Sequence, residues 1–510
     1  MFVTLRAHAL SHPLLLFAIL VAIFACIEKI RHRHSPSVPS AGVGWVRLPA
    51  ACLLVLVYVV LVIVYAATPA YFDHVEPSVA SVSWMVVRGQ PAYPDPEGAA
   101  LYGLPYGPML FLFNGLMMKV LGASIITSKI AGACGAIASL VLVGLALGRV
   151  RGEWSRAVCW MAVVYLMFGA ASTWARAEPL LLFASGLAVL SLTLPRVASW
   201  LLLGIAIGVG VNLKVSAIIY LFPAFALVWK KHGSGALAAT AAAAAVVAAV
   251  PYLFFSNISL AGYLSWLQAA AGQGLRLGAL PAALEWMIVL TVPMFAMGRR
   301  EIARADSDAG MFRVLVIASM AVSIPLAIKH GTGVYHFLPF VPSIMFAACA
   351  ARKPGPLTPA LLATFVLIAA LQVPPWMTAT TSLPSRQMIS ELKQIESAHT
   401  GVVAMGYSAN YRLTFFRPEL VFDGQPYALD GASMMDWRWS GRPFPAAALT
   451  ALRDCAVDVW LIPSGAPPFV LPNGYSIAGD VFPDSFRKTF AERYALETSG
   501  QWFDVWRCRR

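Results

Sequence analysis

Residues 48–67 read LPAACLLVLVYVVLVIVYAA, and after five further residues the chain reads Asp73-His74-Val75-Glu76-Pro77. An uncharged apolar run of this length is long enough to cross a bilayer as an α-helix. Two carboxylates close to a membrane surface suit proton transfer, because desolvation and mutual repulsion both raise a carboxyl pKa. The loop after this helix is therefore the first candidate for chemistry.

The composition of the whole chain predicts an α-helical polytopic membrane protein. Of 510 residues 59% are hydrophobic and only 12% are charged, and apolar runs long enough to span a bilayer recur between residues 13 and 374. The first run, residues 13–27, lacks a small-residue cleavage site and leads into the basic stretch 29–33. We therefore expect it to be a retained helix and not a cleaved signal peptide.

The net charge of +13 does not indicate a nucleic-acid partner, because the excess lies in the membrane part. Residues 376–510 carry 13 basic and 13 acidic side chains, whereas residues 1–375 carry 24 basic and 11 acidic ones. Basic residues in short loops between apolar helices mark the cytoplasmic side. The markers are Lys29, Arg31, Arg33, Arg47, Arg149, Arg151, Arg156, Arg196, Lys230, Lys231, Arg299, Arg300, Arg304, Arg313, Arg352 and Lys353.

All these markers agree if residues 106–121 do not cross the membrane but form a juxtamembrane helix on the outer surface. About 12 spans then remain. They are residues 13–28, 48–67, 125–147, 157–173, 178–195, 199–212, 215–229, 236–255, 282–297, 312–328, 336–350 and 357–374. The first large external loop is residues 68–124. Residues 1–375 form the membrane domain.

The unusual polar residues lie at helix ends on the outer side. They are Asp73, His74, Glu76, Arg176, Glu178, Asn212, Lys214, Gln273, Arg276, Lys329, His330, Tyr335 and His336. A single polar group at a helix end often only snorkels to the surface. Five loops that converge on one face indicate instead an external site lined by both signs of charge, which suits an anionic, lipid-linked substrate.

Residues 376–510 predict a compact external α/β domain of a usual size. Strand-like runs occur at residues 401–407, 420–422, 457–462 and 502–506, and a helical stretch at 388–398. Cys455 and Cys508 form a disulfide or remain two free thiols; the sequence leaves both readings open. No metal-binding Cys/His pattern, GxSxG, Walker loop or GxGxxG motif is present.

The ordered set of motifs over residues 48–375 resembles the GT-C superfamily of membrane glycosyltransferases, which includes protein O-mannosyltransferases, aminoarabinose transferases and lipopolysaccharide-core sugar transferases. The matching stretches lie in the external loops, apart from one basic cytoplasmic turn. They are Asp73-His74-Val75-Glu76-Pro77-Ser78-Val79-Ala80, Gly89-Gln90-Pro91-Ala92-Tyr93, Leu104-Pro105-Tyr106-Gly107-Pro108, the basic turn Gly148-Arg149-Val150-Arg151-Gly152, Ala175-Arg176-Ala177-Glu178-Pro179, and Gly331-Thr332-Gly333-Val334-Tyr335-His336-Phe337-Leu338-Pro339.

The resemblance implies inverting transfer of a sugar from a polyprenyl-phosphate carrier to a hydroxyl group of a lipid, glycan or protein at the outer membrane face. Many members place two acids side by side or one residue apart, whereas Asp73 and Glu76 are three apart. Either one is the base, and the other orients the acceptor or a divalent metal ion. The resemblance also implies a bacterial inner membrane, with the active site and the external domain in the periplasm.

The resemblance also assigns roles to the other polar residues. The phosphate candidates are Arg176, Lys214, Lys329 and His330, and the candidates for the sugar pocket are Tyr93, Tyr106 and His336, with His74 and Glu178 beside them. Structural roles compete with these assignments: Asp73 as a helix cap, an Arg176–Glu178 pair across its turn, and His336 as a wall residue.

Two other functions remain as alternatives at this point. A secondary transporter or lipid-linked-sugar flippase fits the span count, although transporters bind near the bilayer midplane and often contain inverted repeats, which this sequence lacks. A scaffold or sensor leaves the acids and the facing cations without a use.

Overall fold

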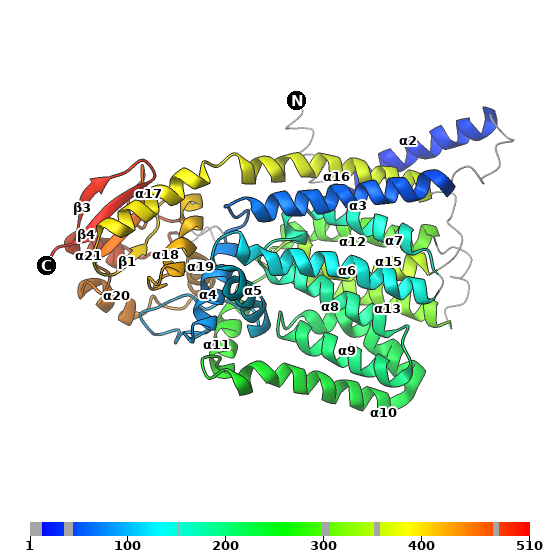
Figure 1. The fold of residues 1–510 in the computed structure, drawn as a ribbon, viewed down its shortest axis with the longest axis horizontal. Helices are drawn as coiled ribbons and strands as arrows, with labels where there is room; N and C mark the ends of the chain where they lie inside the picture. The colour runs from blue at the N-terminus through cyan, green and yellow to red at the C-terminus, as the bar shows by residue number, and fades with distance from the viewer. Residues whose placement is uncertain (1–12, 35–43, 151, 298–306, 351–357, 473–478) are drawn as a thin grey trace.

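The computed structural model describes residues 13–34, 44–150, 152–297, 307–350, 358–472 and 479–510. It is mostly helical, with a bundle at one end and a smaller α/β region at the other (Figure 1). Some predicted cytoplasmic markers lie outside the described residues: Arg151, Arg299, Arg300, Arg304, Arg352 and Lys353.

The bundle consists of apolar helices of very different lengths. They are α2 (Pro13–His34), α3 (Gly44–Ala67), α6 (Ile130–Arg149), α7 (Trp154–Phe168), α8 (Ala177–Ser191), α9 (Arg196–Val211), α10 (Ala217–Phe254), α12 (Leu280–Met297), α13 (Asp308–Val322), α15 (Val341–Cys349) and α16 (Thr358–Thr381). Within the described part of the chain, five stretches are long and apolar enough to cross a membrane by themselves: Thr127–Arg149, Trp154–Ser172, Ala217–Phe254, Leu277–Phe295 and Leu361–Ala398. The protein is therefore an integral membrane protein. The count of 12 spans stays a prediction.

Helix α10 contains a sharp bend that corresponds to the break expected between residues 229 and 236. Gly233 has φ +80°, a left-handed conformation that favours glycine, and the helices before and after it fold back on each other (Figure 1). The two spans predicted there thus form two helices on either side of one glycine.

Helix α16 carries the chain out of the bundle without a break at Pro374-Pro375. It continues to Thr381 and is followed by α17 (Ser385–Ala398) on the way to the α/β region (Figure 1). Two consecutive prolines remove two backbone donors, but their φ is compatible with a helix. The domain boundary expected after residue 375 therefore falls inside a helix.

The α/β region contains one four-stranded sheet in the order β1-β2-β4-β3. The strands are β1 (Val403–Met405), β2 (Val459–Pro463), β3 (Tyr494–Ser499) and β4 (Phe503–Cys508). β1 and β2 are parallel and the other pairs antiparallel. The strand predicted at 420–422 is wrong, because these residues belong to α18 (Pro418–Phe422), which begins with a proline at its first position.

The same region contains further short helices and one cystine. The helices are α19 (Gly431–Trp439), α20 (Ala446–Arg453) and α21 (Asp484–Arg493). Cys455 and Cys508 are bonded, with their Cα atoms 6.0 Å apart. The bond ties the end of β4 to the residues that precede β2.

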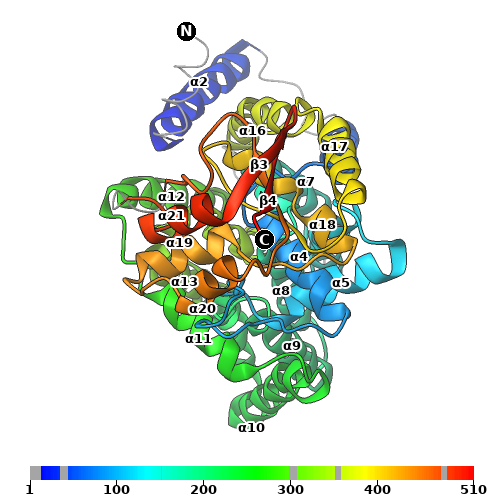
Figure 2. The ribbon, with the colours of Figure 1, turned by 90° about the vertical axis from the view of Figure 1, so that its left-hand side faces the viewer.

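Two short helices lie where the bundle meets the α/β region (Figures 1 and 2). They are α4 (Glu76–Val87) and α5 (Pro108–Leu121), and α5 corresponds to the helix predicted on the outer surface. A Cβ atom at Gly115 of α5 would lie 2.5 Å from the Ser83 carbonyl of α4, so only glycine permits this close approach. The loop between the helices reaches the α/β region through a bridge between Leu101 and Leu429. Elements of the bundle and of the α/β region thus lie side by side around α4.

Candidate active site

Glu76 is completely buried, and its carboxylate accepts four hydrogen bonds. Its Oε1 accepts hydrogen bonds from the backbone N–H groups of Phe72 (2.9 Å) and Asp73 (3.0 Å). Its Oε2 accepts from the Tyr65 hydroxyl (2.5 Å) and from the Ala175 N–H (2.9 Å). Burial raises the pKa of this carboxyl, and the hydrogen bonds oppose that shift. Glu76 therefore fixes the loop before α4 to the loop before α8.

A buried lysine, Lys129, binds the chain where α3 leads into this loop. The Lys129 ammonium donates to the carbonyls of Tyr65 (2.8 Å), Thr68 (2.6 Å) and Ala70 (3.0 Å) at the end of α3. Tyr65 lies in the last turn of α3, and Thr68 and Ala70 follow its end, so the cation binds carbonyls at the negative end of the helix dipole. Lys129 was not among the predicted site residues, although a lysine near the outer end of the span predicted at residues 125–147 was a possible signal.

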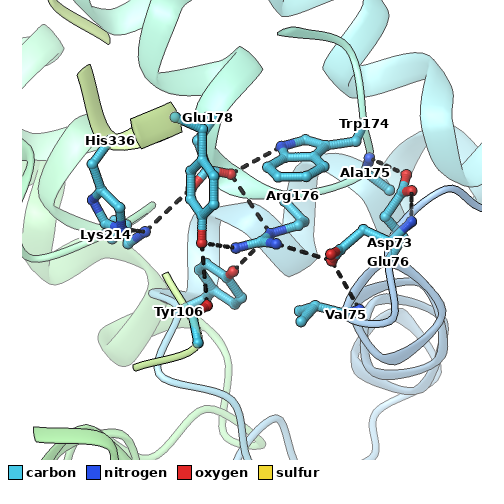
Figure 3. A network of polar contacts seen from close by, with 12 residues as sticks. Asp73, Val75, Glu76, Tyr106, Trp174, Ala175, Arg176, Glu178, Lys214 and His336 are labelled. Carbon is cyan, nitrogen blue, oxygen red and sulfur yellow. Dashed lines mark hydrogen bonds and ion pairs between the residues drawn. The ribbon is translucent and has the colours of Figure 1, made fainter. Parts of the chain in front are cut away.

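Asp73 is the more accessible of the two acids, with 17% of its side chain exposed. Its Oδ1 accepts from Arg176 Nη1 (2.9 Å) and from the Val75 N–H (3.0 Å) (Figure 3). Its Oδ2 lies 3.4 Å from His74 Nδ1. Burial raises the pKa of Asp73, but Arg176 and His74 outweigh it, so the pKa lies well below its usual value. Asp73 is thus ionised and available from one side.

The Arg176 guanidinium is held on every side. Its central carbon lies 4.2 Å from the ring centroid of Trp174 and 4.9 Å from that of Tyr335. Nε donates to the Tyr106 hydroxyl (3.1 Å) and Nη2 to the Tyr335 hydroxyl (2.9 Å), while Nη1 binds Asp73. Lysine has neither this fork of donors nor this flat face. Arg176 therefore presents Nη1 to Asp73 in a fixed direction.

A second ion pair lies on the far side of Arg176 (Figure 3). Lys214 Nζ lies 3.1 Å from Glu178 Oε1 and 3.4 Å from His336 Nε2. Glu178 Oε2 accepts from Trp174 Nε1 (2.9 Å) and lies 3.8 Å from Arg176 Nε. Burial lowers the pKa of the Lys214 ammonium, and Glu178 opposes that shift. Because 17% of its side chain is exposed, Lys214 is a cation that an anion can reach.

Three predicted site residues lie outside this network. The hydroxyl of the buried Tyr93 donates to the Tyr106 carbonyl (2.7 Å), so Tyr93 holds the backbone of Tyr106 in place. Lys329 donates to the carbonyl of Ala270, and the His330 ring lies 4.3 Å from the ring of Trp439 in α19. Lys329 and His330 therefore line the contact between a membrane loop and the α/β region.

A third carboxylate, which was not among the predicted site residues, reaches this contact from the α/β region. Asp436 of α19 accepts a hydrogen bond from the Gln273 amide. Burial raises the pKa of Asp436 to about 7, although the neighbouring Lys329 and His74 lower it. Nothing in the sequence distinguishes this aspartate from a surface residue, because its surroundings come from loops more than one hundred residues away.

Metal binding is not indicated by clustering of ligands. Within the part of the chain that the structure describes, no group of three or more His, Cys, Asp or Glu side chains is placed to hold a metal ion. The divalent ion considered for Asp73 and Glu76 stays a prediction.

Solved structures with the same fold place the chain in a structural class. No protein-family model and no curated protein matches the sequence. The fold is similar to the crystal structure of ArnT from Cupriavidus metallidurans bound to undecaprenyl phosphate, with TM-score 0.57, 12% identity, and coverage of 92% of this chain and 98% of that chain. The apo structure of the same protein gives TM-score 0.51 and 14% identity over the same shares.

The chain therefore has the fold of the GT-C membrane glycosyltransferases, as the resemblance in its sequence predicted. Similarity at these identities establishes the fold alone.

Proposed function

We propose that the protein is an inverting glycosyltransferase that moves a sugar from a polyprenyl-phosphate carrier to a hydroxyl acceptor at the outer face of the membrane. The observation that carries this proposal is the linear arrangement of Asp73, Arg176, Glu178 and Lys214, with an accessible acid at one end and an accessible cation at the other. A glycosyl transfer needs both groups, one for the proton of the acceptor and one for the departing phosphate.

In the proposed reaction Asp73 is the base. The acceptor oxygen forms a bond to C1 of the sugar, the bond between C1 and the phosphate oxygen breaks, and the acceptor proton moves to Asp73. Direct displacement inverts the anomeric centre. The low pKa of Asp73 makes it a weak base, so we expect the proton to leave late, when positive charge on the sugar has already made the attacking hydroxyl acidic.

Lys214 is the proposed ligand of the phosphate. The donors of Arg176 are engaged by Asp73, Tyr106 and Tyr335, whereas Lys214 is partly exposed and has one well-placed partner in Glu178. A preorganised cation stabilises the charge that develops on the leaving phosphate. No step of this mechanism uses a metal ion.

The direct experiment is transfer of labelled sugar in proteoliposomes. The full chain is given undecaprenyl phosphate carrying mannose, galactose or arabinose, with membrane lipids and glycans as acceptors, and inversion is read from the anomeric configuration of the product. Asp73→Asn should lower transfer by about 10²–10⁴-fold. Glu97→Gln is the matched control, because Glu97 is an exposed carboxylate of the same loop. Full activity of Asp73→Asn contradicts the assignment of the base.

The side of the membrane is tested separately. We propose that the site and the α/β region face the periplasm of a bacterium, because the basic loops mark the opposite side. Proteolysis of the α/β region from outside in spheroplasts, and not from inside in inverted vesicles, is the expected result.

A further inference from the structure

Helix α19 is fixed to the helix that follows the Asp73 loop. Its N-cap, Asp430, accepts hydrogen bonds at Oδ2 from the Ser433 N–H (2.7 Å) and the Ser433 hydroxyl (2.7 Å). At Oδ1 it accepts from the Tyr427 hydroxyl (2.6 Å) and from the hydroxyl of Ser78, which belongs to α4. The position of α19 is thus set by the membrane part as well as by its own region.

Asp436 lies further along α19 and faces two loops of the membrane part. These loops are joined by an antiparallel bridge between Leu275 and Lys329. Gln273, itself 4% exposed, donates its side-chain amide to Asp436, which is partly exposed. The Lys329 ammonium interacts electrostatically with Asp436, so a carboxylate, an amide and an ammonium from three separate segments are neighbours here.

Aromatic side chains border this polar group. Trp439 is partly exposed at the end of α19, with its ring 4.3 Å from that of His330. Trp437, one residue after Asp436, packs at 5.5 Å against Trp266 of α11 (Leu260–Ala271). Aromatic rings beside carboxylate and amide groups suit a ligand that has both apolar C–H faces and hydroxyl donors.

From this geometry we propose a sugar-binding subsite between α19 and the loops 272–276 and 329–336, in which Asp436 accepts hydrogen bonds from ring hydroxyls. The proposal deepens the proposed function and rests on it. It makes the α/β region a part of the active site.

The charge of the group favours a sugar over a phosphate as its ligand. Asp436 repels an anion, and it accepts hydrogen bonds that a hydroxyl can donate and a phosphate cannot. Lys329 already donates to the Ala270 carbonyl, so its ammonium is partly engaged. The phosphate is expected on the other side, at Lys214, where the neighbouring cations Arg176 and Lys329 add to the positive potential and, in addition to burial, lower the pKa of the Lys214 ammonium.

The ring hydroxyls can come from the sugar on the carrier or from a sugar on the acceptor. A binding measurement separates the two sources. The full chain in nanodiscs is titrated with undecaprenyl phosphate alone and with undecaprenyl phosphate carrying mannose, galactose or arabinose. The variants are Asp436→Asn and, as a matched control, Glu492→Gln, an exposed carboxylate on α21.

For the carrier sugar, the wild-type chain should bind at least one sugar-bearing carrier more tightly than undecaprenyl phosphate. Asp436→Asn should lower the ratio of these two affinities about tenfold, because a hydrogen bond to a charged group is lost. Binding of undecaprenyl phosphate should stay within about twofold. For an acceptor sugar, Asp436→Asn should leave all these affinities unchanged and raise KM for a glycan acceptor by about tenfold.

The proposal is overturned if Asp436→Asn matches the wild type in every affinity and in KM, or if it weakens undecaprenyl phosphate as much as the sugar-bearing carriers. Gln273→Leu serves as a second variant if Asp436→Asn does not fold, and it should lower the same ratio. Absence of transfer with every donor refutes the proposed function. The binding measurements do not depend on transfer, so they still test the sugar subsite.

Discussion

Replacing Glu76 by glutamine tests the division of labour between the two acids. The structure gives Glu76 four partners, all of which donate: the hydroxyl of Tyr65 and the N–H groups of Phe72, Asp73 and Ala175. A carboxylate accepts from all four. Glutamine has one acceptor oxygen, and its amide group donates.

The cost of Glu76→Gln can be worked out from these contacts. If the amide faces Phe72 and Asp73, two buried N–H groups lose their acceptor. If it faces the other pair, the Tyr65 hydroxyl can turn and accept, but the Ala175 N–H is left unpaired. One unpaired buried donor and weaker remaining hydrogen bonds lower the free energy of unfolding by about 2–4 kcal/mol.

Asp73→Asn should act mainly on the reaction. An asparagine oxygen still accepts from Arg176 and from the Val75 N–H, but the buried Arg176 guanidinium loses the charge opposite it, so we expect a loss of about 2–3 kcal/mol. The proton acceptor is gone, however, and transfer should fall by about 10²–10⁴-fold. The Glu76→Gln protein keeps the base. Its transfer activity per folded protein should therefore fall only about tenfold, because the loop that carries Asp73 is held less firmly.

The assay pairs thermal unfolding in detergent with transfer measured per folded protein, using Glu97→Gln as the control. A Glu76→Gln protein that unfolds at the wild-type temperature and has no transfer activity would refute this reasoning. That result would make Glu76 the base and leave Asp73 as the residue that positions Arg176.

Other predictions concern the cations, the external carboxylate and the cystine. Arg176→Lys should lower transfer by at least about tenfold while Lys214→Met mainly raises KM for the donor, because only the latter is expected to contact the phosphate; equal effects on kcat and KM in both would contradict this. The pKa of Asp436 is about 7 in the fold, above its unfolded value, so the stability that its protonated form gives is present at low pH and lost as pH rises through 7. Wild-type thermal stability should therefore fall relative to that of Asp436→Asn between pH 5 and 8, and parallel curves would refute the shift. Replacing Cys455 and Cys508 by serine opens a link across 53 residues and should lower the free energy of unfolding by roughly 2–4 kcal/mol, read as a lower unfolding temperature.

The sequence predicted the class of fold because the length of an apolar run and the basic residues of a loop depend only on neighbouring positions in the chain. It also brought Asp73, Arg176 and Lys214 into consideration, since charges at helix ends stand out in an apolar background. Local patterns were insufficient where an element is short. Residues 420–422 are apolar and look like a strand, yet the proline at 418 begins a helix there.

The roles of the two acids were beyond a local pattern for a different reason. Glu76 is occupied because the Ala175 N–H, 99 residues away, points at it. Asp73 is ionised because Arg176, 103 residues away, donates to it while its guanidinium packs beside the rings of Trp174 and Tyr335. Asp436 acquires its surroundings only when α19 docks on loops of the membrane part. These properties follow from tertiary contacts, which a spacing of three residues does not reveal.

The order of charges in the site fits the movement of charge in the proposed reaction. Asp73, Arg176, Glu178 and Lys214 alternate in sign, with successive distances of 2.9, 3.8 and 3.1 Å, so the row is neutral before the substrate binds. The sugar-bearing phosphate carries one negative charge, and the released polyprenyl phosphate gains another as the proton reaches Asp73. Negative charge is thereby lost at the Asp73 end and gained beside Lys214, while the total charge of the site with its substrates stays constant. Arg176, held between the two ends, remains charged throughout, and its rigid setting limits the reorganisation that this transfer of charge requires.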